Sequence, residues 1–391
     1  MGATALLCLL SFGNTFAVGA FAPLIPDIAR AHDLSDREIG MVAAAFGLAR
    51  MIGALPAGAL AGRWLGRTLA AAPVLLCLGI LALVSATGFA TLVLGRFAIG
   101  LAHTCTMVSA LTGILRDHRS GSGSFRLNVF EFVSMLGVLG GLAAVAMAPR
   151  AWSWNVSYLV ASAPVLLVVA AAPALARRFG ATPAVERAGP RRAALRDPAA
   201  PASSTVGMMF VVGIVLGLAW SAASQFVIPL RGTRELGLDR SGVSSLLALA
   251  QIVDLAALLP VGRLADRIGR GPVLGGVAII LGLGTVGIGV GSLPLFVAGC
   301  AGLGAGLAGW MLPLGVIRDH TPAERFAWRT GLYRLGVDGA IFAGPLLSGV
   351  LGERRAGALV AAMGVGAVVV GLSLLRGQWP RRSSAAEAHR T

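Results

Sequence analysis

Residues 262–270 read GRLADRIGR, and residues 58–67 read GALAGRWLGR, a partial copy of the same pattern. Leu60-Ala61-Gly62-Arg63 aligns with Leu264-Ala265-Asp266-Arg267 at an offset of 204 residues. Each segment follows directly after an apolar run and ends on Gly-Arg. The chain therefore carries two related basic loops at equivalent places in its two halves.

A second repeat supports the first. Arg116-Asp117-His118 is matched by Arg318-Asp319-His320 at an offset of 202 residues, again just after an apolar run. Two independent matches at nearly one offset indicate an internal duplication, and duplication of a six-helix unit is a known plan among transporters.

Long apolar runs fill most of the 391 residues. The chain is 56% hydrophobic and only 13% charged, with a mean hydropathy of +0.82, whereas a soluble domain is about a quarter charged. Because about 20 apolar residues cross a roughly 30 Å hydrocarbon core, the sequence predicts an all-α integral membrane protein. We predict twelve transmembrane helices, at 3–26, 38–61, 68–88, 90–115, 127–148, 156–176, 206–230, 241–261, 272–292, 293–317, 330–352 and 356–376. A signal peptide is the alternative for the first run, which lacks a basic n-region.

One long polar segment separates two sets of six predicted helices. It is rich in Arg, Pro, Ala and Ser and has no apolar periodicity, which is typical of a flexible linker. We therefore divide the chain into an N-terminal six-helix bundle at 1–176, a cytoplasmic linker at 177–205, a C-terminal six-helix bundle at 206–376 and a cytoplasmic tail at 377–391.

The net charge of +15 reflects the arginines, which make up all 32 basic residues. With the N-terminus in the cytoplasm, 21 arginines fall on the cytoplasmic side and 8 in outer loops. Since short cytoplasmic loops carry an excess of basic residues, we expect a multi-pass protein of the inner (cytoplasmic) membrane with both termini inside. The charge is thus explained by topology and does not indicate a nucleic-acid partner.

GRLADRIGR resembles the loop signature Gly-x-x-x-Asp-Arg-x-Gly-Arg of the major facilitator superfamily. Twelve helices, two halves and a basic central loop are also similar to that family's plan, so the resemblance implies two pseudo-symmetric six-helix bundles. It further implies a gating loop in which the acid bonds to a helix start and to nearby arginines, bracing one conformation; a helix N-terminus stabilises a carboxylate. The gating residues here are Gly262, Asp266, Arg267, Gly269 and Arg270. Gly62 replaces the acid in the first-half copy, so we expect the second-half copy to carry more of the gating.

Arg96 and Gly100 resemble an Arg-x-x-x-Gly element of the fourth helix, which the family associates with proton coupling. The polar residue usual before the glycine is Ile99 here. Drug/proton antiporters of the family carry Gly-Pro in the fifth helix, whereas Gly344-Pro345 lies in the eleventh, the repeat partner of the fifth. Export in exchange for protons and proton-coupled uptake both stay open, and we favour export.

Ionisable residues inside predicted helices are costly and tend to face cavities or partners. We assign proton coupling to Arg96, Glu131, Asp254, Arg334 and Asp338. Arg334 and Asp338 are four residues apart and can pair on the eleventh helix. Glu131 and Asp254 lie on the fifth and eighth helices, which meet across the two halves in this family, so the two acids would form a proton site. Internal ion pairs without a role in transport are the alternative.

Three further expectations concern the interior. Arg96 and His103 are seven residues apart and share a face of the fourth helix, and we expect Arg50 to have a structural partner on the eleventh. The resemblance implies that helices one, four, seven and ten line a central cavity. Our candidates for its lining are Asn14, His103, Trp220, Gln225 and Trp310, with packing between helices as the alternative.

These observations predict secondary active transport of a small organic solute by alternating access, coupled to protons or another ion. A transporter-like membrane sensor and a membrane-embedded lipid-modifying enzyme are the alternatives; the enzyme would need a dense acid or histidine cluster, which the sequence lacks. The four cysteines lie in apolar runs without metal-ligand spacing. We therefore expect a monomer in the lipid bilayer that is not an enzyme and holds no cofactor or metal.

Overall fold

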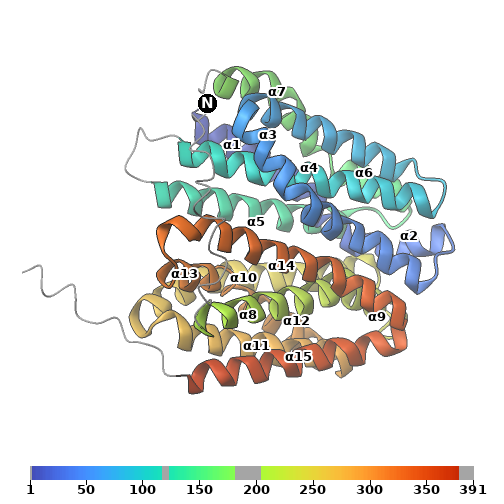
Figure 1. Cartoon of the computed structure of the whole chain (residues 1–391). Helices are drawn as coiled ribbons and strands as arrows, with labels where there is room; N and C mark the ends of the chain where they lie inside the picture. The colour runs from blue at the N-terminus through green and yellow to red at the C-terminus, as the bar shows by residue number, and fades with distance from the viewer. Residues whose placement is uncertain (1, 117–122, 181–203, 378–391) are drawn as a thin grey trace, which may run out of the picture.

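The structure is a computed structural model that describes residues 2–116, 123–180 and 204–377, and within these ranges it is built of helices and turns (Figure 1). Helices α1–α7 form one group, here the N-terminal group, and α8–α15 form the C-terminal group beside it. The elements of the N-terminal group are α1 (Ala3–Gly19), η1 (Ala22–Leu24), α2 (Ile25–Ala31), α3 (Asp36–Val84), α4 (Phe89–Arg116), α5 (Gly123–Met147), α6 (Trp154–Ala161) and α7 (Pro164–Gly180). Those of the C-terminal group are α8 (Ser204–Ala222), η3 (Ala223–Val227), α9 (Ile228–Arg234), α10 (Arg240–Ile268), α11 (Arg270–Val290), α12 (Leu293–Leu307), α13 (Leu312–Asp319), α14 (Ala323–Leu351) and α15 (Glu353–Arg376).

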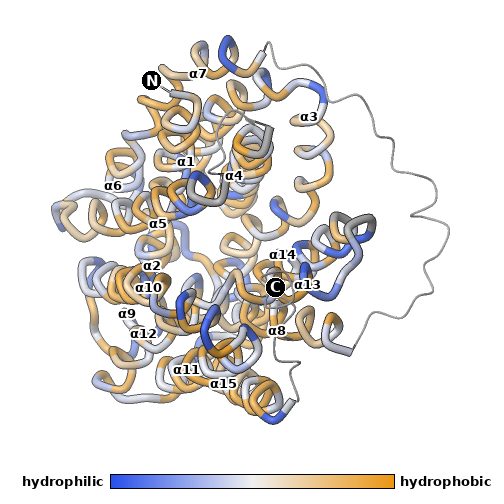
Figure 2. Tube along the Cα trace, turned by 90° about the vertical axis from the view of Figure 1, so that its left-hand side faces the viewer, coloured by the Kyte–Doolittle hydropathy of each residue, from blue (hydrophilic) through white to orange (hydrophobic). Residues whose placement is uncertain are grey.

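The predicted membrane spans are present in the described part of the chain. Ten helical segments are long and apolar enough to cross a membrane, or eleven when α6 and α7, bent by 41° at their junction, are taken as one span. Figure 2 shows hydrophobic residues along nearly all of these helices. Many large apolar side chains are exposed, among them Leu55, Leu94, Leu166 and Leu167 at 63% or more, and such a surface suits lipid rather than water.

Helix α3 contains two of the predicted spans. Its 49 residues include a non-helical residue, Trp64 (φ −138°, ψ 51°). Phe46 and Ala49 pack against Gly100 of α4, and Gly79 packs against the neighbouring Ile99. A straight helix would separate residues 46 and 79 by about 50 Å, so the chain must fold back near Trp64. Counting α3 as two spans gives the predicted twelve.

Several spans predicted as continuous are interrupted instead. The first breaks at Ala20–Leu24, the seventh contains a π-helical turn at Ala223–Val227, and the tenth breaks between Leu307 and Leu312. A proline follows each of the three interruptions: Pro26, Pro229 and Pro313 lie in the first turn of α2, α9 and α13 respectively. Because proline has no backbone N–H, it cannot donate the hydrogen bond that would continue the helix before it. Ala20, Phe21, Ala223 and Phe226 are at most 1% exposed, so the first two breaks are shielded from lipid, as hydrocarbon requires.

The ends of the spans define two ends of the molecule. The distal end holds the turns at 32–35, 148–153, 235–239 and 352, and α2 and α9 lie there in Figure 1. The opposite, terminal end holds the start of α1 and the end of α15. The predicted linker and tail lie mainly outside the described residues, since α7 continues to Gly180 and α15 ends at Arg376.

Glycines hold α11 against α15 over their full length. Gly275, Gly282 and Gly289 lie opposite Gly371, Gly364 and Gly357 respectively, at intervals of seven residues on each helix. A Cβ atom on Gly282 would come within 2.5 Å of the carbonyl oxygen of Gly364. Because lipid gives helices little hydrophobic reason to associate, such close backbone packing is a main source of their adhesion.

We expect Gly282→Ala to destabilise the protein, because the added methyl group meets backbone that has no side chain to move aside. Overpacking of this kind costs about 1–3 kcal/mol. Gly276→Ala is the matched control, since a Cβ atom there meets nothing within 4 Å. Thermal unfolding in detergent measures the difference, and equal melting temperatures for the two variants would show that the α11–α15 contact is not tight.

Candidate substrate and coupling site

Asn14 and His103 meet within the N-terminal group. His103 Nδ1 on α4 lies 2.6 Å from Asn14 Oδ1 on α1, and Asn14 Nδ2 donates to Thr106 Oγ1 at 3.4 Å. Asn14 is fully buried, and the His103 ring lies 5.3 Å from that of Phe46 on α3. A polar pair is thus built into the apolar interior where three helices meet.

Arg96 is the largest fully buried side chain of the described residues. Its guanidinium carbon lies 3.8 Å from the ring centre of Phe21 and 4.6 Å from that of Phe46. Since Arg96 and His103 both contact Phe46, the prediction that they share a face of their helix is confirmed. Cation–π contacts are worth about 2 kcal/mol each when desolvated and offset part of the cost of burying the charge.

Arg96 reaches the other group through one hydrogen bond. Arg96 Nη2 donates to Gln225 Oε1, in the π-helical turn of the seventh span, at 3.3 Å. Nε and Nη1 of Arg96 are buried without a partner. A guanidinium with only one long hydrogen bond, to a neutral amide, is poorly compensated for its lost hydration.

Trp220 and Trp310 form a pair within the C-terminal group. Their ring centroids are 6.0 Å apart in an edge-to-face arrangement, and both rings are partly buried. Trp310 lies in the break between α12 and α13, and Trp220 lies three residues before the π-helical turn. The cavity candidates therefore fall into three sets: Asn14 with His103, Trp220 with Trp310, and Gln225 with Arg96.

Arg50 and Asp338 join the two groups. Arg50 Nη2 of α3 lies 2.7 Å from Asp338 Oδ1 of α14, so the predicted partner of Arg50 on the eleventh helix is confirmed. The expected pairing of Asp338 with Arg334 is not what the structure shows. Arg334 is exposed and instead interacts electrostatically with Glu131 of α5.

Glu131 and Asp254 are electrostatic neighbours across the two groups. Asp254 of α10 is 5% exposed; one of its oxygens accepts from Gln251 Nε2 at 3.2 Å, and the other, Oδ1, has no partner. Glu131 also interacts with Arg50. Acids and arginines from four helices thus form one connected charged set at the contact between the groups: Arg50, Glu131, Asp254, Arg334 and Asp338.

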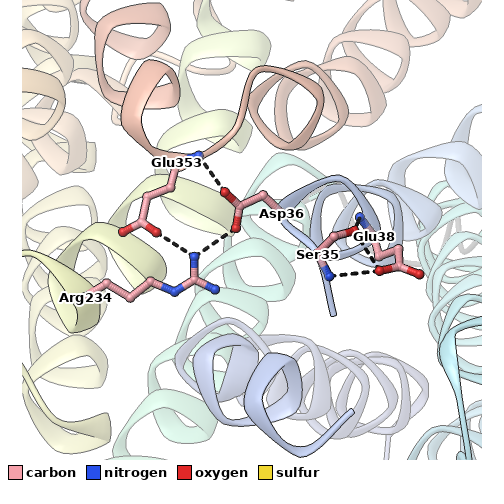
Figure 3. A network of polar contacts seen from close by, with 5 residues as sticks. All are labelled: Ser35, Asp36, Glu38, Arg234 and Glu353. Atoms are coloured by element: carbon pink, nitrogen blue, oxygen red, sulfur yellow. Dashed lines mark hydrogen bonds and ion pairs between the residues drawn. The ribbon is translucent and has the colours of Figure 1, made fainter. Parts of the chain in front are cut away.

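The distal end carries a network that sequence reasoning missed. Asp36, the first residue of α3, accepts the backbone N–H of Glu353 at 2.8 Å and pairs with Arg234 Nη1 at 2.8 Å, and Arg234 also pairs with Glu353 (Figure 3). Asp36 thus caps the start of α15 in the other group, where the helix dipole favours a negative charge. Ser35 and Glu38 form a capping box that fixes the start of α3.

A second arginine crosses between the groups nearby. Arg240, at the start of α10, donates to Asp27 of α2 and to Ser157 of α6, each at 2.7 Å, and to the carbonyl of Trp152 at 3.2 Å. Together Asp27, Asp36, Arg234, Arg240 and Glu353 are here named the distal clasp. The sequence held one signal for it, the Ser-x-x-Glu pattern at 35–38, but no pattern that pairs residues about 200 positions apart.

The predicted gating loop lies at the terminal end. Asp266 is exposed on the last turn of α10, and within the described residues its carboxylate has no hydrogen bond or ion pair. Arg270 pairs with Asp319 of α13 rather than with Asp266. Gly269 has φ +97°, which explains a glycine between α10 and α11. In the first-half repeat Arg116-Asp117-His118, which matches Arg318-Asp319-His320, Asp117 and His118 lie outside the described residues.

A sequence model of the Major Facilitator Superfamily matches residues 7–230 and again residues 208–390. The chain belongs to this superfamily. No curated protein matches the sequence. Membership establishes a multi-pass membrane protein of a transporter family, in agreement with the predicted fold class.

Solved superfamily structures share the fold at low identity. A mutant of the nucleoside transporter NupG has a TM-score of 0.77 and 13% identity, with 95% of this chain and 100% of that one covered. A mutant of the peptide transporter POT in complex with alafosfalin has a TM-score of 0.74 and 14% identity, with 95% and 93% covered. At this identity the likeness extends to the superfamily fold and not to the substrate.

We expect Asp36→Ala to open the distal end, because it removes the Arg234 ion pair and the cap on α15 together. The loss is about 1–3 kcal/mol for a charge-assisted backbone bond and a half-exposed ion pair, enough to shift a two-state population about tenfold. Spin labels at the exposed residues Ala31 and Ser292, one in each group, report the distance. Arg30→Ala is the control, since Arg30 pairs with Asp27 inside the N-terminal group. A distance distribution identical to wild type in Asp36→Ala would exclude the clasp as a gate.

Proposed function

We propose that this chain is a secondary active transporter that moves a small organic solute by alternating access and couples the movement to protons. The observation that carries the proposal is the charged set Arg50, Glu131, Asp254, Arg334 and Asp338 at the contact between the two groups. Charges inside a membrane are expensive and are kept where they act or pair. Here they lie where a relative motion of the groups would change their partners.

The N-terminal and C-terminal groups are the two rocking domains in this proposal. Close backbone contacts support a distal end that is closed in this conformation, because Gly40 lies against Gly349 and Gly47 lies against Phe342. The distal clasp reinforces that closure. Glycine at these contacts allows tight closure, and the ion pairs allow reopening because water can replace them.

The terminal end is the cytoplasmic side in this proposal. Helix α7 ends, α8 begins and α15 ends at that end, and the sequence that joins α7 to α8 and follows α15 is rich in arginine, which favours the cytoplasm. The conformation described is then inward-facing, and the exposed Asp266 fits a terminal-end latch that is released. In the outward-facing state, Asp266 would gain the partners expected for the gating loop.

Asn14, His103, Trp220, Gln225 and Trp310 are the proposed substrate-contacting residues. Support comes from the positions of Asn14 on α1 and His103 on α4, and from the helix interruptions in the seventh and tenth spans. Gln225 and Trp310 lie within these interruptions, and Trp220 lies three residues before the first of them. Interrupted helices line the sites of many transporters. The mixture of aromatic rings and amides suits a small amphipathic solute.

Glu131 and Asp254 are the proposed proton carriers. Glu131 acts electrostatically on Asp254, and arginines act on Glu131, so taking up or releasing one proton changes the balance of the whole charged set. Arg50, which pairs with Asp338, would pass that change to the contact between α3 and α14.

We expect Glu131→Gln and Asp254→Asn each to abolish flux driven by a pH gradient while leaving substrate binding within about threefold of wild type. A thermal-shift screen of purified protein would identify a substrate. Flux of that substrate into proteoliposomes, with and without a pH gradient, would then measure proton coupling. Asp33→Asn is the control, because Asp33 is an exposed acid with φ +53°, a conformation that asparagine also adopts. Proton-driven flux at the wild-type rate in both test variants would rule out these acids as carriers. Binding without any flux would favour the sensor.

We expect cysteines at positions 103 and 310 to react with a water-soluble thiol reagent, in a background in which Cys8, Cys77, Cys105 and Cys300 are replaced. The reason is that both side chains would face one aqueous chamber, although His103 contacts Asn14 and Trp310 contacts Trp220. Substrate should slow the reaction. If neither cysteine reacts in any conformational state, His103 and Trp310 pack between helices and do not line an aqueous chamber.

A further inference from the structure

Three basic side chains of the N-terminal group surround one phenylalanine. The guanidinium carbons of Arg96 and Arg50 lie 4.6 Å and 5.8 Å from the ring centre of Phe46, and the His103 ring lies 5.3 Å from it. Arg50 and Arg96 also act electrostatically on His103. Arg50, Arg96 and His103 are here named the Phe46 basic cluster.

The ion-pair partner of Arg50 and the hydrogen-bond partner of Arg96 come from the other group of helices. Asp338 of α14 pairs with Arg50, and Gln225 in the π-helical turn accepts one hydrogen bond from Arg96. The Gln225 amide is neutral and lies at 3.3 Å, and two further nitrogens of Arg96 have no acceptor although the side chain is only 1% exposed. The positive charge of Arg96 is therefore poorly compensated at the interface between the groups.

Separation of the groups at the distal end would withdraw Gln225 and Asp338 together with the C-terminal group. Arg96 would keep Phe21 and Phe46, which both belong to its own group, and would face the opened space with its donors free. With aromatic rings packed against the guanidinium, an acceptor would approach in the plane of its N–H groups, which is the geometry that a carboxylate prefers.

We propose that the Phe46 basic cluster binds the carboxylate of a small organic acid, and that this acid is the transported solute. Arg96 is the anchor, Arg50 adds charge once Asp338 has left, and Gln225 takes the place of the carboxylate in the closed conformation. Trp220 lies on the same span as Gln225, and its partner Trp310 lies on the tenth span. The two rings offer an aromatic surface to the apolar part of the organic acid. This inference rests on the proposed transport function and names its substrate class.

The test uses thiol labelling rather than flux, so its failure is separable from a failure of transport. Gln225→Cys, in the background without native cysteines, places a thiol beside Arg96. We expect an anionic methanethiosulfonate to react at least tenfold faster, relative to a cationic one, when Arg96 is present than in Arg96→Gln. Arg37→Gln, which changes an exposed arginine at the distal end, is the control and should leave this ratio unchanged.

Ligand protection then identifies the anion. Benzoate should slow labelling at position 225, whereas benzamide of nearly the same shape, and chloride at the same concentration, should not. Arg96→Lys, which keeps the charge but loses the planar fork, should retain the preference for the anionic reagent and lose most of the benzoate protection; it also serves if Arg96→Gln fails to fold.

Each of the following results would overturn the proposal. A reagent ratio that does not depend on Arg96, or a thiol at position 225 that never reacts, would mean that Arg96 meets no solvent and serves packing alone. Equal protection by benzoate and chloride would assign the cluster to an inorganic anion. Equal protection by benzoate and benzamide, or none by either, would exclude a carboxylate ligand.

Discussion

A hydrocarbon surrounding supplies neither hydrogen bonds nor counter-ions, and this constraint shapes every part of the molecule. It requires the backbone to be helical wherever lipid touches it. The first and seventh spans break only where Phe21 and Phe226 are fully enclosed by protein. The same constraint draws charges into one region, where Arg50 pairs with Asp338 and Glu131 acts electrostatically on Asp254 across the two groups.

Two kinds of contact hold the groups together at the distal end in this conformation. Backbone contacts such as Gly40 with Gly349 are short and apolar, whereas the distal clasp consists of partly exposed ion pairs, with side chains between 15% and 39% exposed. Exposed pairs contribute only about 0.2–1 kcal/mol each. Because the closure is built largely from such weak pairs, the open and closed states differ in free energy by only a few kcal/mol. A bound solute or proton is able to reverse a preference of that size.

Sequence reasoning was successful where one local property decides the structure. Apolar length gave the spans, and the isolated charge of Arg50 pointed to a partner on the eleventh helix, which Asp338 supplies. The interruptions at Ala20–Leu24 and 308–311 were missed because hydropathy averages over them, although Pro26 and Pro313 mark both. A proline near a span end is also compatible with a continuous helix, so its position alone does not decide between the two.

Pairings between distant residues were the least predictable part. Asp338 pairs with Arg50 and not with the nearby Arg334, and Arg270 pairs with Asp319 and not with Asp266. The packing of the helices decides which of these side chains meet. The distal clasp joins Asp36 to residues 198 and 317 positions away. Loop arginines such as Arg234 and Arg240 serve in the sequence analysis only to predict which side of the membrane each loop lies on. The neighbouring sequence does not distinguish an arginine that closes the distal end from one that only sets the orientation.

We propose that transport requires the distal end to open. The most direct measurement is flux through protein without the four native cysteines, whose distal end is locked by a short bifunctional methanethiosulfonate, which forms disulfides with cysteines at positions 27 and 240. The native side chains at these positions meet at 2.7 Å. We expect the lock to stop flux and a reducing agent to restore it to the level of the unlocked double variant. Undiminished flux through the locked protein would contradict this proposal.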